Sequence, residues 1–286
     1  MNFIPEIELQ PLEAQQRYQL SKLKETLAYV NSCSPWYSKL FKETNTEIAK
    51  LATLADLKNL PTTSKQDLQK HNWDFLCVPK SQIKEYTATS GTMGSPVVIA
   101  MSEKDLERLA YNEYLSFHHL GASTEDVFQL MLTLDRQFMA GMAYYSGLRR
   151  IGASSVRTGP GLPAMQWDVI HQLQTTSLVG VPSFLLKMKA YANEQQIDLN
   201  TCTVKSVLAI GESLRDENLQ PNALAKKIQE DWKIKLYSTY ASTEMQTAFT
   251  ECEYGQGGHH HPELVIVELL DEQGNEVPKG MPGEVT

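Results

Sequence analysis

Short apolar runs that alternate with helix-length segments constrain the fold of this chain more than any other feature of its sequence. The runs are rich in β-branched residues, which is typical of strands. Strands are expected at Val97–Ala100, Val127–Leu132, Ser154–Val156, Leu178–Val181, Val207–Ile210 and Ile234–Tyr237. Helices are expected between them, for example from Ser102, at Met165–Leu173 and at Pro182–Asn193. The alternation predicts βαβ units, and therefore an α/β fold with largely parallel sheets and flanking helices.

The two ends of the chain differ from this middle part in their pattern of apolar and polar residues. Near the N-terminus, apolar residues recur at helical spacing from Leu20 to Val30, and Ser64 with Asp67 forms a capping pattern for a further helix. Near the C-terminus, Leu264–Leu270 is followed by a polar turn and by a second run up to Thr286, which predicts an antiparallel β region. The expected parts are a mainly helical region packed on the main domain (1–80), an α/β core (81–262) and the truncated start of a β subdomain (263–286).

Composition narrows the class of protein. The 286 residues exceed the usual size of one core, and the hydrophobic fraction of 42% is ordinary for a globular chain. A formal net charge of -8, without a long Lys/Arg run, argues against nucleic acid as a partner. No apolar run is long enough for a membrane partner and no signal-peptide pattern opens the chain, so we expect a cytoplasmic protein. The four cysteines are scattered, which predicts reduced thiols.

A loop rich in hydroxyls and glycines lies directly before the expected strand at Val97–Ala100. It runs from Tyr86 to Pro96, and its glycines let backbone N–H groups approach an anion while its hydroxyls offer further donors. The residues with these properties are Thr89, Ser90, Gly91, Thr92 and Gly94. The loop could therefore wrap phosphates, although an ordinary polar turn has the same composition. The Gly-Lys-Ser/Thr ending of a Walker loop is absent.

A second polar segment, Leu236–Glu244, follows the expected strand at Ile234–Tyr237, where open parallel sheets commonly bind ligands. Tyr240 offers a flat face for an adenine, Thr243 a hydroxyl for phosphate and Glu244 an oxygen ligand for Mg²⁺. Taken alone, a glutamate such as Glu244 is more often a solvated surface carboxylate.

Together, these two segments resemble the signatures of the adenylate-forming (AMP-binding) superfamily, and they occur in the same order. Between them, Gly211–Leu214 is similar to the superfamily's Gly-Gly-Glu-x-Leu turn, and Gly180–Ser183 to its preceding strand-to-helix turn. Other segments resemble phenylacetate-CoA ligases in particular. These are Ser34–Tyr37, Leu60–Lys65, Glu251–Cys252 and Gly257–His259.

The resemblance implies a function and a set of small-molecule partners. Such enzymes activate a carboxylic acid with ATP and Mg²⁺ as an acyl-adenylate, release pyrophosphate, and transfer the acyl group to coenzyme A with release of AMP. An aromatic, phenylacetate-like acid is the expected substrate, and a homodimer is compatible with the resemblance. Two alternatives stay open: an acceptor other than CoA, or a fragment that binds nucleotide or acyl-adenylate without catalysis. A Rossmann dehydrogenase and a serine hydrolase are disfavoured, because neither Gly-x-Gly-x-x-Gly nor Gly-x-Ser-x-Gly occurs in the required context.

The resemblance also implies roles for individual residues. In the catalytic set, Thr89, Ser90 and Thr92 would hold pyrophosphate oxygens and Glu244 would bind Mg²⁺. The nucleotide-binding set would be Gly91, Gly94, Gly211, Glu212, Ser213, Tyr240, Ala241, Ser242 and Thr243. Phe138, Tyr145 and Gly147 fall where the family forms its acyl pocket, although the two aromatic residues are equally well explained as core.

The sequence departs from the family pattern at several positions. Met93 and Ser95 stand where the phosphate loop usually has Thr and Lys, and Ala241 stands where the second signature has Gly. Ala241 would be tolerated only if its φ is not positive. The family's ribose-binding Asp, hinge Arg and lid Lys would lie beyond Thr286, so we expect the C-terminal lid domain to be absent and adenylation to be impaired.

A cysteine and histidine cluster raises the question of zinc. Cys252 and His259 have the Cys-x6-His spacing of a pair that joins further cysteines in phenylacetate-CoA ligase-like proteins, and His261 follows. Structural zinc is almost always four-coordinate, so His261 and a fourth group would have to join. The alternative is a buried thiol beside a polar His-rich loop.

Overall fold

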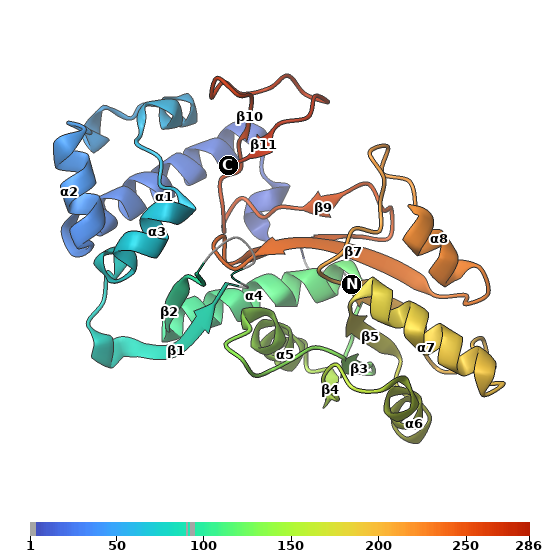
Figure 1. Ribbon diagram of the computed structural model, residues 1–286. Helices are drawn as coiled ribbons and strands as arrows, with labels where there is room; N and C mark the ends of the chain where they lie inside the picture. The colour runs from blue at the N-terminus through green and yellow to red at the C-terminus, as the bar shows by residue number, and fades with distance from the viewer. Residues whose placement is uncertain (1–3, 90, 92–94) are drawn as a thin grey trace. The chain divides into compact units, whose positions relative to one another are not determined.

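The computed structural model describes residues 4–89, 91 and 95–286 (Figure 1). These residues divide into two compact units. The first contains Lys104–His259, and the second contains Ile4–Glu103 together with His260–Thr286. The division into three parts was expected from changes in the pattern of apolar and polar residues along the sequence, and it stays a prediction.

The first unit is built on a mixed sheet with the strand order β4-β3-β5-β6-β7-β8-β9. Its strands are β3 (Val127–Leu130), β4 (Ser154–Arg157), β5 (Ser177–Gly180), β6 (Ser206–Ala209), β7 (Lys235–Ser242), β8 (Thr247–Glu251) and β9 (Gly258–His259). Neighbours from β4 to β7 pair in parallel, and β8 and β9 continue the sheet antiparallel. The predicted α/β fold with a largely parallel sheet is thus confirmed.

Helices cover both faces of this sheet (Figure 1). They are α4 (Glu103–His119), α5 (Met139–Ile151), α6 (Pro163–Leu173), α7 (Pro182–Glu194) and α8 (Ala223–Gln229). Side chains of α6, α7 and α8 form one core cluster with one face of the strands, and side chains of α4 and α5 form another with the opposite face. The two clusters explain why the strands read as continuous apolar runs.

The strands contribute to the two clusters alternately. Leu178 of β5 packs in the cluster of α6, α7 and α8, and the next residue, Val179, packs in the cluster of α4 and α5. Val207 and Leu208 of β6 divide in the same way. Since successive strand side chains point to opposite faces, a central strand buried on both sides carries mostly apolar residues.

The second unit contains the mainly helical N-terminal region and two small antiparallel sheets. Its α-helices are α1 (Leu12–Cys33), α2 (Pro35–Glu43) and α3 (Lys65–His71), and 3-10 turns lie at Glu6–Leu9, Ile48–Lys50, Leu54–Asn59, Asn72–Phe75 and Lys80–Gln82. Its strands are β1 (Ile83–Ala88), β2 (Val98–Ser102), β10 (Leu269–Leu270) and β11 (Glu284–Val285). Strand β1 pairs with β2 and β10 with β11, both antiparallel, as expected for the C-terminal residues.

The predicted helix start at Ser64 is confirmed at the level of its capping contacts. The Ser64 hydroxyl accepts the Asp67 backbone N–H, and the Asp67 carboxylate accepts the backbone N–H of Ser64 at 2.9 Å. Both groups would otherwise be orphan donors of the first turn of α3. Helices α1 and α2 pack through Leu27 and Phe41, which lie with Leu51 in a small core of the second unit.

Strand β7 is longer than the sequence analysis predicted. The expected strand ended at Tyr237, whereas β7 continues to Ser242 because its second half pairs with β8, from Thr239 opposite Thr250 to Ser242 opposite Thr247. The Tyr240 segment therefore lies in a hairpin rather than in a loop.

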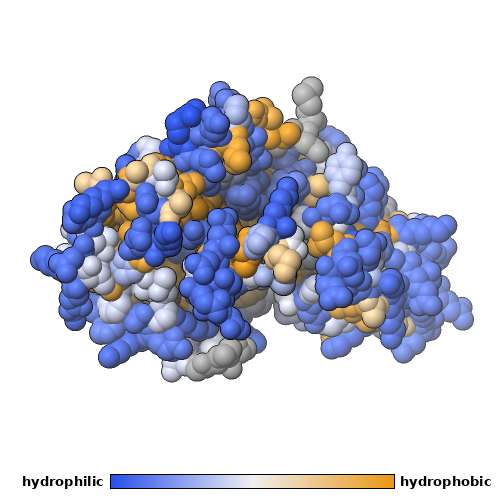
Figure 2. All heavy atoms as spheres, turned by 90° about the horizontal axis from the view of Figure 1, so that it is seen from above, coloured by the Kyte–Doolittle hydropathy of each residue, from blue (hydrophilic) through white to orange (hydrophobic). Residues whose placement is uncertain are grey.

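None of the helices formed by the described residues is both long and apolar enough to cross a membrane. On the face shown in Figure 2, hydrophilic residues cover most of the surface and hydrophobic residues form small separate groups.

Candidate functional site

Two of the predicted motifs meet at the carboxyl ends of β5 and β6. Strand β5 leads into α7, whose first turn contains Ser183, and β6 leads into the turn at Gly211–Leu214. The Ser183 backbone N–H donates to Glu212 Oε2 at 2.7 Å. The N-terminus of a helix favours a negative charge, so Glu212 both stabilises the start of α7 and fixes the Gly211 turn beside it.

Gly211 leaves open space at this turn. Its φ is +76°, a conformation that favours glycine, and a Cβ built at this position would find no atom within 4 Å. Gly211 also lines a cavity of the first unit. The adjacent Ser213 is exposed, and its hydroxyl donates to the Arg215 carbonyl oxygen at 2.9 Å. A glycine here gives a ligand close access to the backbone.

The Tyr240 segment forms the end of the β7–β8 hairpin. Tyr240 is 57% exposed, and its ring stacks on that of Phe249 with centroids 6.2 Å apart. Ala241 pairs with Ala248 in the ladder and is not among the described residues with positive φ, so the alanine is tolerated where the family has glycine. Glu244 is exposed in the turn that joins the two strands.

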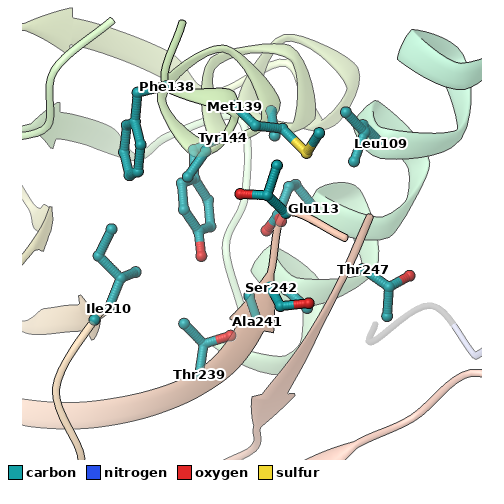
Figure 3. Close-up of a pocket in the computed structure, with 15 residues that line it drawn as sticks. Leu109, Glu113, Phe138, Met139, Tyr144, Ile210, Thr239, Ala241, Ser242 and Thr247 are labelled. Atoms are coloured by element: carbon teal, nitrogen blue, oxygen red, sulfur yellow. The ribbon is translucent and has the colours of Figure 1, made fainter. Parts of the chain in front are cut away.

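A cavity of about 180 Å³ lies between this hairpin, the Gly211 turn and helices α4 and α5 (Figure 3). Ala241, Ser242 and Thr243 line it from the hairpin. The helices add mostly apolar side chains, among them Leu109, Met139 and Tyr144. The structure thus brings Gly211 and three residues of the second motif to one cavity within the first unit.

The three predicted acyl-pocket residues have different positions. Phe138, which immediately precedes α5, lines the cavity. Among the described residues, Tyr145 and Gly147 are not part of its lining, and the neighbouring Tyr144 takes that position. The guanidinium of Arg157 lies over the Tyr145 ring, 5.4 Å from its centroid. Helix α5 thus turns Tyr144 rather than Tyr145 toward the cavity.

Gly147 lies instead at the contact between α5 and α4. A Cβ at this position would lie 2.5 Å from Glu113 Cβ and 2.9 Å from the Glu113 carbonyl carbon. Glycine therefore lets α5 approach α4 closely at Glu113, which lines the cavity.

Glu113 is a carboxyl group in a nearly apolar environment. The residue is 4% exposed, and its Oε2 atom has no hydrogen-bond partner in the part of the chain that the structure describes. Burial raises the pKa of Glu113 from its ordinary value of 4.5 to about 8, and the Ser116 hydroxyl partly opposes this rise. Burial and the nearby Glu113 likewise raise the pKa of Tyr144. Both groups are therefore uncharged near neutral pH.

A polar stripe on α4 holds the β8 strand. Asn112 exchanges two hydrogen bonds with the Ala248 backbone, at 2.8 and 3.1 Å, as a neighbouring strand would. One turn earlier, Arg108 donates to the Gln246 carbonyl oxygen at 2.7 Å. One turn later, the Thr250 hydroxyl donates to Ser116 at 3.0 Å. These contacts fix the hairpin that lines the cavity.

A buried ion pair ties the Gly211 turn to the end of β8. Arg215 Nε and Nη2 donate to the two carboxylate oxygens of Glu251 at 3.0 and 2.8 Å, and Glu251 is 1% exposed. The same carboxylate accepts the Ser238 backbone N–H at 2.8 Å. This two-point geometry holds the turn against β7 and β8.

The predicted phosphate loop belongs to the second unit. Thr89 and Val97 close its base through two hydrogen bonds, each 3.0 Å long. The Thr89 backbone N–H donates to the Val97 carbonyl oxygen, and the Val97 backbone N–H donates to the Thr89 hydroxyl. Thr89 is 6% exposed, so this hydroxyl supports the loop. Gly91 has φ +67°. Ser90, Thr92, Met93 and Gly94 lie outside the described residues.

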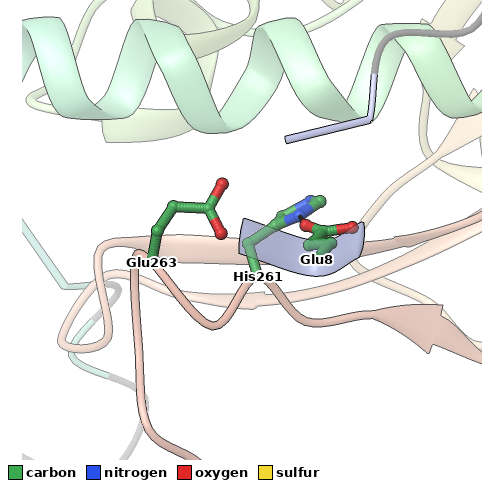
Figure 4. A group of neighbouring side chains, drawn as sticks. All are labelled: Glu8, His261 and Glu263. Carbon is green, nitrogen blue, oxygen red and sulfur yellow. Dashed lines mark hydrogen bonds and ion pairs between the residues drawn. The ribbon is translucent and has the colours of Figure 1, made fainter. Parts of the chain in front are cut away.

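The predicted zinc ligands fall in different surroundings. Cys252 is half-buried at the end of β8, and the exposed His259 in β9 places its ring 4.4 Å from that of His119. His261 belongs to the second unit and is 2% exposed, with Nδ1 2.5 Å from Glu8 Oε1 (Figure 4). Among the described residues it groups with Glu8 and Glu263, whose ligand atoms lie within 4.8 Å of one another and of the imidazole. Zinc at Cys252 and His259 stays a prediction.

Comparison with protein families decides what these motifs represent. The family model for AMP-binding enzymes matches residues 30–286. This chain belongs to the AMP-binding enzyme family. The match covers Lys104–His259 of the first unit, most of the second unit, and all four motifs, which lie in the expected order.

Curated relatives of this AMP-binding chain include phenylacetate-coenzyme A ligases. One from Thermus thermophilus is 24% identical over 288 residues, covering 99% of this chain and 63% of the relative. One from Pseudomonas putida is 23% identical, covering 98% of this chain and 63% of the relative. The chain thus spans less than two thirds of the length of these two ligases.

Solved structures show the same AMP-binding fold. A 2-hydroxyisobutyryl-CoA ligase in complex with 2-HIB-AMP and CoA matches with a TM-score of 0.87 at 20% identity, over 99% of this chain and 63% of that one. A benzoate CoA ligase from Burkholderia xenovorans matches with a TM-score of 0.55 at 18% identity, over 73% of this chain and 40% of that one.

Sequence reasoning about this AMP-binding chain missed Glu113, Tyr144 and the pair of Arg215 with Glu251. A signal for Glu113 was present, because Leu109 and Phe117 lie four residues before and after it on the same helix. Residues four apart share a helix face, so this glutamate falls on an apolar stripe, and a burial expectation could have been drawn from it. The partner of Arg215 lies 36 residues away, and no local pattern indicates it.

Proposed function

We propose that this protein activates a carboxylic acid with ATP as an acyl-adenylate and transfers the acyl group to coenzyme A, with release of pyrophosphate and AMP. One observation carries the proposal: Gly211 and Ala241–Thr243, which come from two separate family motifs, line one cavity whose helical wall is mostly apolar. Such a cavity can receive a polar nucleotide at one side and an apolar acyl group at the other.

The motif residues suit the parts of a nucleotide. The exposed face of Tyr240 would stack on adenine, and Gly211 would let the base approach the backbone, since no atom fills the space beside it. Ser242 and Thr243 would offer hydroxyls to the α-phosphate, and Glu244 would supply an oxygen ligand for Mg²⁺. The loop at Thr89–Pro96 would bind the pyrophosphate that leaves.

The chemistry needs alignment more than a protein nucleophile. The attacking group is the carboxylate of the acid itself, and the phosphate charge must be neutralised while the two reactants are held in line. Hydrogen bonds hold the two motif segments in place: Glu212 is bound to the start of α7, and the hairpin is bound to α4 through Asn112. A fixed hairpin and a fixed turn are what such alignment requires.

The cavity supports an aromatic acid as substrate. Its volume of about 180 Å³ exceeds the ~150 Å³ of an engineered apolar cavity that admits benzene. Phe138 and Tyr144 give it aromatic walls. A phenylacetate-like acid would place its ring among these side chains and its carboxylate toward Gly211 and Thr243.

Binding of a stable acyl-adenylate analogue tests the proposal without requiring turnover. We expect a non-hydrolysable phenylacetyl-adenylate analogue at ~100 times its dissociation constant to raise the apparent stability of this chain by about 2.7 kcal/mol, measured by thermal unfolding. Tyr240→Ala should reduce the affinity because the stacking face is removed. Tyr254→Ala is the matched control, since Tyr254 is a 78% exposed tyrosine that is not part of the cavity lining. A folded chain that the analogue does not stabilise would refute the proposed function.

A further inference from the structure

Glu113 brings to the cavity lining a carboxyl group of which one oxygen, Oε2, has no hydrogen-bond partner among the described residues. The side chains around it are mostly apolar, and Figure 3 shows its carboxyl among the lining residues near Met139 and Tyr144. Oε2 is buried and has no partner among the described residues. A buried polar atom without a hydrogen bond is costly, so such an atom at a ligand cavity calls for a partner.

The neighbouring polar groups are already engaged elsewhere. Asn112, the preceding residue on α4, is bound to the Ala248 backbone through both its amide oxygen and its amide nitrogen. The Ser116 hydroxyl receives the Thr250 hydroxyl at 3.0 Å and also interacts with Glu113. Thr239, which interacts with the Tyr144 hydroxyl, has its own hydroxyl 2.9 Å from that of Thr250. Glu113 thus lines the cavity with a buried Oε2 atom that has no protein partner among the described residues.

The position of Glu113 is fixed from behind. Gly147 allows the backbone of α5 to pack directly against Glu113, with contacts so short that a methyl group would not fit. Glu113 therefore cannot retreat from the cavity by a shift of α4 toward α5. A rigid support of this kind is typical of a group that positions a ligand.

The chemistry of Glu113 decides which ligand group it would accept. Burial raises the pKa of its carboxyl to about 8, and Tyr144, the titratable side chain that faces it from α5, is also held neutral. A protonated carboxyl offers one O–H donor and one acceptor oxygen. That pair matches a hydroxyl group, which likewise donates once and accepts.

We propose that Glu113 selects an aromatic acid whose ring carries a hydroxyl group, by hydrogen bonding to that hydroxyl inside the cavity. The inference rests on the proposed function, because it assigns the acyl group to this cavity. A ring without the hydroxyl would bury Oε2 with no partner, whereas a hydroxylated ring satisfies it. A site that hydrogen-bonds a substrate hydroxyl discriminates strongly against the analogue that lacks it.

The test compares acyl-adenylate analogues made from phenylacetic acid and from its ortho-, meta- and para-hydroxy derivatives. Their dissociation constants are measured by calorimetry on the wild-type chain and on Glu113→Gln, Glu113→Leu and Phe138→Leu. We expect at least one hydroxylated analogue to bind the wild type about tenfold more tightly than the unsubstituted one. Glu113→Gln should keep this preference, because an amide also donates and accepts.

Two further variants separate hydrogen bonding from packing. Glu113→Leu should abolish the preference while binding the unsubstituted analogue at least as tightly as the wild type does. Phe138→Leu removes a ring contact but no hydrogen-bonding group, so it should weaken all four analogues by a similar factor. The wild-type preference and the Glu113→Gln result do not depend on whether Glu113→Leu folds.

The outcomes distinguish the two proposals. Equal affinity of the wild type for all four analogues, or a preference that survives in Glu113→Leu, would overturn the role of Glu113 and leave the proposed function standing. A folded chain that binds none of the four would overturn the proposed function and this inference with it.

Discussion

Replacing Glu113 by glutamine should make the stability of the protein less dependent on pH. Below pH 4.5 the carboxyl is protonated in both the folded and the unfolded chain. Between pH 4.5 and about 8 the unfolded chain releases this proton while the folded chain keeps it, because burial raises the pKa of Glu113 to about 8. The unfolded state then binds fewer protons, so the free energy of unfolding of the wild type falls as the pH rises.

The size of this effect follows from the two pKa values. At about 1.4 kcal/mol per pH unit, the wild type should lose roughly 5 kcal/mol relative to Glu113→Gln between about pH 4.5 and pH 8. Urea unfolding at a series of pH values, followed by tryptophan fluorescence, measures the difference. Glu107→Gln makes the same change at an exposed position of α4 and controls for the loss of one charge. A difference between wild type and Glu113→Gln that stays constant from pH 5 to pH 9 would show that burial does not raise the pKa of Glu113.

Two other substitutions test the supports of the cavity. Gly147→Ala should lower the free energy of unfolding by about 1–3 kcal/mol in denaturant unfolding, because the new methyl group would overlap Glu113. Ser146→Ala on the same helix is the control. Equal stability of the two variants would contradict the close packing. Arg215→Met should lower it by about 3–5 kcal/mol, since it leaves the buried Glu251 carboxylate without its cation. The exposed Arg149→Met should cost far less, and a similar loss in both arginine variants would contradict a specific role for the ion pair.

The fold was predictable where its signals are local. The strands β5 and β6 are buried on both faces, so nearly every residue in them is apolar and the runs are visible in the sequence. The start of α3 was predictable because Ser64 and Asp67 lie three residues apart. The second half of β7 was not, because Tyr240 and its neighbours become strand only through pairing with β8, a contact that no local pattern encodes.

The sequence motifs predicted several residues of the candidate site, but they did not predict which side chains of α4 and α5 face the cavity. Gly211 and Ala241–Thr243 were expected from their family signatures, and they line the same cavity. Which of Tyr144 and Tyr145 faces the cavity depends on the rotation of α5 about its axis. The sequence of that helix, which includes two glycines, did not predict this rotation. The apolar stripe through Leu109 and Phe117 indicated that Glu113 is buried, but its close packing against Gly147 and its proximity to Tyr144 could be seen only in the structure.

A crystal structure of this chain with the phenylacetyl-adenylate analogue would show where the two ends of the ligand bind. We expect the adenine ring against Tyr240 beside Gly211, and the phenyl ring inside the cavity between Phe138 and Tyr144. Electron density for the analogue anywhere else on a folded chain, with the cavity empty, would contradict it.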